Sequence, residues 1–189
     1  MRGILRSGVL WAGLMAVLAG LTGCGVEFDN VFMGDSITAA WSVPGKNLGV
    51  PGNTTAKMLL RFPDEVPGHG YKTFVFLGGT NDIRYDIPIE DALGNITTMA
   101  KAARQAGMAV VLCELSPNYQ DKFTHDPDIR ALNKMIVQLA ASENYFLVDY
   151  YDPMVGHPEY FLDGLHPNAV GYAVMDRALL PVLSSAREP

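Results

Sequence analysis

Residues 28–38 have the sequence FDNVFMGDSIT, and this stretch decides the fold. Its first six residues are mostly apolar and of strand length, and Gly34 closes them. A short apolar run that ends in a turn residue is typical of a strand buried on both faces, as in a parallel sheet. Ser36 then stands where the chain leaves the sheet, where it would open a helix or a tight turn.

The same alternation of strand and helix continues along the chain. Further short apolar runs predict strands at residues 74–77, 109–115 and 145–148, and residues 46–50 are a candidate for another, shorter strand. Apolar residues at helical spacing predict helices at residues 54–62, 89–105, 128–142 and 167–183. This order predicts an α/β fold, a three-layer α/β/α sandwich around a parallel sheet of about five strands.

The N-terminal segment has the composition of an export signal. Arg2 and Arg6 give it a positive start, and residues 9–21 are uncharged, mostly apolar and short for a membrane span. The sequence Leu-Thr-Gly-Cys that ends at Cys24 resembles the bacterial lipobox, whose cysteine is lipidated. We therefore expect residues 1–23 to be a lipoprotein signal peptide. An ordinary secretory signal or short anchor, with Cys24 incidental, is the alternative.

A lipidated Cys24 would hold the protein at a membrane of the bacterial cell envelope, with residues 24–189 as a single domain. Gly25, and not aspartate, follows the cysteine, which favours the outer over the inner membrane. Residues 1–23 hold two of the 14 basic residues and none of the 20 acidic ones, which leaves a balance of −8. So acidic a chain would repel nucleic acid.

The cysteines and histidines give no metal-binding pattern. The chain has two cysteines, and if Cys24 is lipidated then Cys113 has no disulfide partner. Cys113 lies in an apolar run, which indicates a small core residue. No cysteine and histidine cluster has the spacing of metal ligands.

Polar residues follow the predicted strands at points where a parallel sheet gathers its ligands. Ser36 follows the first strand and Asn81 a later one, while Asp163 and His166 precede the last helix. Acyl transfer requires a hydroxyl, a base that takes its proton, and a carboxylate that orients the base. These residues therefore indicate a serine, histidine and aspartate triad.

An acyl-transfer site also needs donors for the oxyanion of the tetrahedral intermediate. The amides of Ser36 and Gly52 and the side chain of Asn81 could supply three. Each residue has a structural alternative: Ser36 as a helix N-cap, Gly52 as a turn residue, and Asn81 as a turn former before a capping Asp82. The presence of all parts in this order favours the catalytic interpretation.

The chain resembles the SGNH hydrolases, the GDSL esterase and lipase superfamily, from residue 31 to about residue 175. The resemblance rests on MGDSIT at 33–38, LGGTNDI at 77–83 and DGLHPN at 163–168. The first motif has isoleucine in place of leucine, which is common in the family. The resemblance implies a flavodoxin-like fold, no metal and no cofactor. It also implies that Ser36 is the nucleophile, His166 the base and Asp163 the orienting carboxylate. The implied oxyanion donors are Ser36, Gly52 and Asn81.

We expect an esterase that cleaves short acyl esters of carbohydrates, lysophospholipids or small alcohols through an acyl-serine. The chain has no long lid-like insertion, which argues against long-chain triacylglycerol lipase activity. Acyl transfer to a polysaccharide hydroxyl and non-catalytic binding in the envelope are the alternatives. Trp41, Tyr85 and Tyr119 are candidates for the substrate rim.

Overall fold

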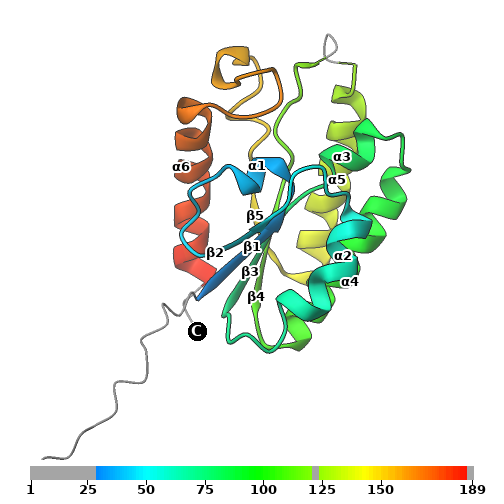
Figure 1. The fold of residues 1–189 in the computed structure, drawn as a ribbon, viewed down its shortest axis with the longest axis vertical. Helices are drawn as coiled ribbons and strands as arrows, with labels where there is room; N and C mark the ends of the chain where they lie inside the picture. Colours follow the sequence, from blue (N-terminus) through cyan, green and yellow to red (C-terminus); the bar gives the residue numbers. More distant parts are fainter. Residues whose placement is uncertain (1–28, 121–123, 187–189) are drawn as a thin grey trace, which may run out of the picture.

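The computed structural model describes residues 29–120 and 124–186 and has a single five-stranded parallel sheet at its centre (Figure 1). The strand order is β2-β1-β3-β4-β5. The strands are β1 (Asn30–Gly34), β2 (Lys46–Gly49), β3 (Thr73–Leu77), β4 (Ala109–Cys113) and β5 (Phe146–Val148). This is the flavodoxin-like order, in which the chain reverses its direction of growth between β1 and β3.

Helices cover both faces of the sheet. The main helices are α2 (Thr55–Glu65), α4 (Ile89–Gln105), α5 (Asp126–Glu143) and α6 (Ala169–Ala186). The short ones are α1 (Ser36–Ala39), α3 (Thr80–Arg84) and the 3-10 helix η2 (Pro158–Tyr160). Helices α2, α4 and α5 lie on one face, and α6 packs against β4 and β5 on the other (Figure 1). The predicted three-layer α/β/α fold is confirmed.

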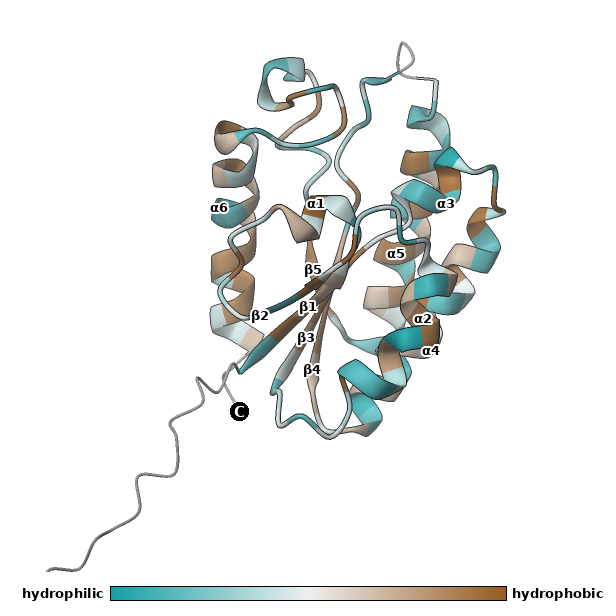
Figure 2. Cartoon of the chain, in the orientation of Figure 1, coloured by the Kyte–Doolittle hydropathy of each residue, from teal (hydrophilic) through white to brown (hydrophobic). Residues whose placement is uncertain are grey.

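The core lies on both sides of the central strands. Every residue of β1 and β3 is buried, which explains why their sequences show continuous apolar runs and not an alternating pattern. Figure 2 shows mostly apolar colours on the central strands, and polar colours on much of α2 and α4. Cys113 is free and fully buried at the end of β4, as predicted for a core residue.

The boundary predicted for the last helix is wrong by two residues. Helix α6 begins at Ala169, while Pro167 pairs with Phe161 in an isolated antiparallel bridge. The Asn168 side chain accepts hydrogen bonds from the amides of Val170 and Gly171, and so caps the helix. An asparagine cap satisfies amides that a proline start would have left without a partner.

The predicted signal peptide and Cys24 lie outside the described residues. Within residues 29–120 and 124–186, the structure has no helix both long and apolar enough to cross a membrane.

The segments that follow β1 and β3 meet the segment before α6 at the carboxyl end of the sheet. Helix α1 follows β1 and helix α3 follows β3, and residues 161–168 lie above the same end (Figure 1). The expected site residues come from these three segments and from the turn after β2.

Candidate active site

Ser36, His166 and Asp163 form a continuous hydrogen-bonded chain. His166 Nδ1 lies 2.7 Å from Asp163 Oδ2. His166 Nε2 lies 2.9 Å from Ser36 Oγ, although Ser36 and His166 are 130 positions apart in the sequence. A carboxylate can only accept, so Nδ1 carries the proton and Nε2 is free to accept one from the serine hydroxyl. The structure thus aligns a hydroxyl, a base and an orienting carboxylate.

Ser36 is held where β1 turns sharply into α1. Asp35 is the N-cap of this four-residue helix, and its Oδ1 accepts a 2.9 Å hydrogen bond from the amide of Ile37. The alternative that Ser36 caps the helix is therefore wrong, and its side chain is available to His166. Gly34 permits the turn, because a Cβ there would lie 2.5 Å from the Leu77 carbonyl oxygen.

The loop that carries the acid and the base is shaped by the acid itself. Asp163 Oδ1 accepts hydrogen bonds from the amides of Leu165 (3.0 Å) and His166 (2.8 Å). Burial would raise the pKa of Asp163, but the hydrogen bonds from His166 and Leu165 outweigh it and hold the pKa at about 2. The carboxylate that faces the histidine is therefore ionised at neutral pH.

The two other expected oxyanion donors lie on neighbouring segments. Asn81 is the second residue of α3, and its Nδ2 donates a 3.0 Å hydrogen bond to the carbonyl of Asn53. Gly52 precedes Asn53 in the turn after β2 and has φ of +74°, a conformation that favours glycine. A Cβ at Gly52 would meet no protein atom within 4 Å, so backbone conformation alone accounts for the glycine within the protein.

A buried polar cluster lies directly beneath these donors. Asp35 is 2 % exposed, and its Oδ2 lies 3.5 Å from Asn81 Nδ2. Burial raises the pKa of Asp35 to about 6, against the opposing effects of the Ile37 hydrogen bond and of His166. Asp82 is fully buried and accepts three hydrogen bonds from Thr55, so it is not the helix cap of the alternative interpretation.

Thr55 and Asp82 are partners that no sequence pattern indicates. In the sequence, Asp82 stood out only as the residue after Asn81 and a possible helix cap, and Thr55 only as a residue of the helix predicted at 54–62. Their contact joins positions 27 residues apart, and such a pairing has no local sequence pattern.

The three rim candidates occupy different environments. Trp41 is 4 % exposed, donates Nε1–H to Asp176 and stacks against Tyr172, so the prediction that it lies at the rim is wrong. Its indole fastens α1 to α6 because it combines a large apolar ring with one donor. Tyr85 is 55 % exposed just after α3, and its place at the rim stays a prediction.

Tyr119 is half-buried between the candidate site and a neighbouring loop. Its hydroxyl accepts hydrogen bonds from the amides of Gly156 and His157, and its ring packs edge-on against Phe161. Its own amide donates to the carbonyl of Gly164. Tyr119 therefore braces the loop that carries Asp163 and His166, and direct contact with a substrate stays a prediction.

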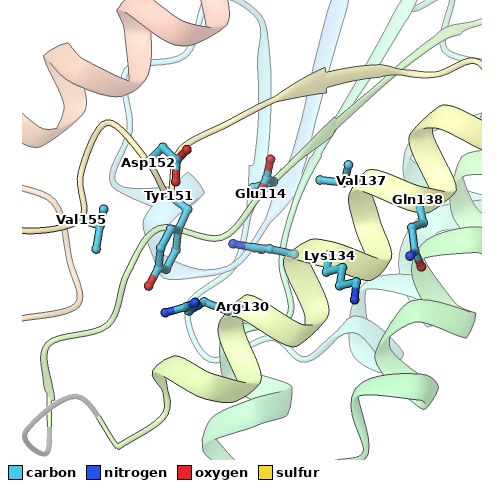
Figure 3. Close-up of a pocket in the computed structure, with 9 residues that line it drawn as sticks. Glu114, Arg130, Lys134, Val137, Gln138, Tyr151, Asp152 and Val155 are labelled. Atoms are coloured by element: carbon cyan, nitrogen blue, oxygen red, sulfur yellow. The ribbon is translucent and has the colours of Figure 1, made fainter.

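A cavity of about 670 Å³ lies between α5 and the segments that follow β4 and β5 (Figure 3). Its walls include Glu114, Arg130, Lys134 and Tyr151. Burial, followed by the charges of nearby aspartates, raises the pKa of Glu114 to about 7. None of the expected site residues lines this cavity, so its position does not coincide with the serine and histidine pair.

The described residues contain no group of three or more His, Cys, Asp or Glu side chains placed to hold a metal ion.

The chain matches a known protein family over most of its length. Residues 43–174, more than half of the sequence, match the GDSL-like Lipase/Acylhydrolase family. The chain belongs to this family. It is accordingly a carboxylic ester hydrolase of the GDSL or SGNH type. The matched range begins after Ser36, so the first motif is supported by the structure and not by the family match.

Solved structures of GDSL hydrolases share the fold. A GDSL-like lipase from Bacteroides thetaiotaomicron is 29% identical with a TM-score of 0.78, over 85% of this chain and 89% of that one. A lipolytic protein of the G-D-S-L family from Veillonella parvula is 21% identical with a TM-score of 0.72, over 82% and 97%. The acetylxylan esterase Axe2 from Geobacillus stearothermophilus is 18% identical with a TM-score of 0.71, over 82% and 94%. A comparison with curated proteins gave no match.

Proposed function

We propose that this GDSL hydrolase cleaves short-chain acyl esters through a covalent acyl-serine at Ser36. The observation that carries the proposal is the chain of hydrogen bonds from Ser36 Oγ through His166 to Asp163. The proposed oxyanion donors are the amides of Ser36 and Gly52 and the side chain of Asn81. No metal or cofactor takes part in the proposed reaction.

In the proposed reaction, His166 Nε2 takes the hydroxyl proton as Ser36 Oγ bonds to the ester carbonyl carbon. The carbonyl electrons move to the oxygen, which the donors stabilise. Asp163 stabilises the imidazolium. His166 then gives the proton to the leaving alcohol as the C–O bond breaks. Water repeats the sequence on the acyl-serine, releases the carboxylic acid and restores the Ser36 hydroxyl.

Short acyl groups are favoured by the size of the segments around Ser36. Helix α1 has four residues and α3 has five, so the described segments here offer little wall to enclose a long chain. The Geobacillus relative is an acetylxylan esterase, which makes an acetylated carbohydrate one substrate to test. Lysophospholipids and small alcohol esters are the others.

We further propose that the protein is a lipoprotein of the bacterial envelope. The supporting features are the apolar segment at residues 9–21 and the lipobox-like sequence before Cys24. Gly25 favours the outer membrane. Metabolic labelling with an alkyne palmitate should mark the full chain but not Cys24→Ser. Equal labelling of the two proteins would contradict the proposal.

Fluorophosphonate labelling of the catalytic unit beside Ser36→Ala, followed by a p-nitrophenyl ester series, tests the reaction and its chain-length preference. We expect Ser36→Ala to lose labelling and the wild-type protein to prefer acetate and butyrate over palmitate. Labelling that survives the substitution would contradict the mechanism, and a preference for palmitate would contradict the substrate class. Acetyl transfer to an added polysaccharide that outpaces hydrolysis would instead indicate an O-acetyltransferase.

A further inference from the structure

The turn that carries Gly52 is fastened to the helix that carries Asn81 by one buried pair, Thr55 and Asp82. Thr55 donates its hydroxyl to Asp82 Oδ1 at 2.6 Å, and its amide donates to Oδ2 at 2.9 Å and to Oδ1 at 3.2 Å. Both side chains are fully buried. Hydrogen bonds to a buried carboxylate are short and strong because little water competes for them.

The Thr55 hydroxyl both donates and accepts a hydrogen bond. Besides its donation to Asp82, it accepts a 3.0 Å hydrogen bond from Nδ2 of Asn95 on α4. Valine at this position would keep the shape of threonine but make neither hydrogen bond. Serine would keep both.

A second contact holds the same turn from its other side. Arg61 on α2 donates Nη2–H to the carbonyl of Leu48 at 2.6 Å and Nε–H to Asn53 Oδ1 at 3.0 Å. The guanidinium thus joins the end of β2 to the residue after Gly52. A planar group with several fixed donors suits a bridge between two backbone segments.

Neither partner of the expected donor pair is held firmly by its own element. Helix α3 has five residues, too few to be stable alone, and Gly52 lies in a turn. Besides the Thr55 and Asp82 pair, the hydrogen bond from Asn81 to the Asn53 carbonyl links the two segments. Their separation must therefore be fixed by contacts outside the pair, and Asp82 directly follows Asn81 in the chain.

We propose that Asp82, through Thr55, and Arg61 are positioning residues that set the spacing between the Gly52 amide and the Asn81 side chain as joint oxyanion donors. The inference rests on the proposed function, since it assigns these two donors to the reaction. Misplacement of a catalytic donor by about 1 Å is enough to lower turnover on the order of a hundred-fold. Asp82, Thr55 and Arg61 would therefore act on kcat without touching the substrate.

The test is a double-mutant cycle on p-nitrophenyl acetate with Thr55→Val and Asn81→Ala. We expect Thr55→Val to lower kcat roughly ten- to a hundred-fold with little change in KM, and Thr55→Ser to restore it. In the Asn81→Ala background, Thr55→Val should cost clearly less, because one of the two donors is already gone. Equal losses in both backgrounds would overturn the proposal, as would a Thr55→Val protein with wild-type kcat.

Thr73→Val is the matched control. Thr73 is also fully buried, lies at the opposite end of β3, and its hydroxyl has no hydrogen-bond partner among the described residues. It should keep its kcat, and a loss equal to that of Thr55→Val would overturn the proposal. If Thr55→Val does not fold, Arg61→Met takes its place in the double-mutant cycle with Asn81→Ala. A wild-type kcat for Arg61→Met would overturn the proposal.

Failure of this proposal is distinguishable from failure of the proposed function. Ser36→Ala and Asn81→Ala would both retain turnover if the proposed function were wrong. If only the positioning role is wrong, both still lose activity while the cycle is additive.

Discussion

The carbonyl oxygen of Gly164 accepts a 2.7 Å hydrogen bond from the amide of Tyr119, and this contact seats the loop of Asp163 and His166 on the segment after β4. Gly164 has φ of +86°, and a Cβ there would lie 3.0 Å from the Gln120 amide nitrogen. A side chain at position 164 would therefore press on the backbone of the segment after β4.

Gly164→Ala should lower kcat about ten- to a hundred-fold, because the new Cβ pushes the loop and His166 away from Ser36. The measurement is kcat and KM on p-nitrophenyl acetate together with the free energy of unfolding. Gly107→Ala is the control, since Gly107 has φ of +84° but open space for a Cβ. Equal kcat values for the two variants would contradict the prediction.

Gly52→Ala should lower the free energy of unfolding by about 1–2 kcal/mol, the cost of a left-handed conformation for an L-residue. It should also lower kcat, because relief of that strain rotates the amide that we propose as an oxyanion donor. Gly68→Ala has a similar φ of +81° and open space away from the site. Urea unfolding and esterase assays of both variants should show equal destabilisation and a kcat loss for Gly52→Ala alone.

His166→Ala should reduce kcat far more than Asp163→Ala. Loss of the base removes proton transfer, with a cost on the order of 10⁶, whereas loss of the orienting carboxylate costs on the order of 10⁴. Steady-state kinetics on an activated ester measure both. A larger loss in Asp163→Ala would show that the shape of the loop, and not the base, limits turnover.

Asp35→Asn should flatten the pH dependence of stability between pH 4 and pH 6. Burial raises the pKa of Asp35 from 3.8 to about 6, so the folded state binds more protons than the unfolded state in this window. Wild-type stability therefore falls as the pH rises from 3.8 to 6, by up to about 3 kcal/mol from this group. Urea unfolding of both proteins from pH 4 to pH 7 checks this, and parallel curves would contradict it.

Trp41→Phe should lower the free energy of unfolding by roughly 1–2 kcal/mol, because it loses the hydrogen bond to Asp176 and part of a well-packed ring. Its kcat and KM on small esters should stay near wild-type values.

Tyr85→Ala should do the opposite, with unchanged stability and a higher KM, if Tyr85 lines the rim. Thermal unfolding and ester kinetics of the two variants separate packing from substrate contact.

The sequence was most informative where a pattern is local. Continuous apolar runs fixed the central strands, because a strand buried on both faces has no polar side to show. It was less informative at element ends. Pro167 was expected to begin α6, but Asn168 caps the helix and Pro167 belongs to a bridge with Phe161. Trp41 was misplaced because an aromatic residue near a motif has no local mark of burial.

By itself, the sequence determined the order of the strands and of the four long helices, the family and the residue types of the proposed reaction, since each depends on short motifs and periodicity. Tertiary structure alone decided that Ser36 meets His166 across 130 residues. It alone also paired Asp82, the residue after Asn81, with Thr55. The physical reason is that a hydrogen bond between distant residues depends on how strands and helices pack, and packing leaves no spacing rule in the chain.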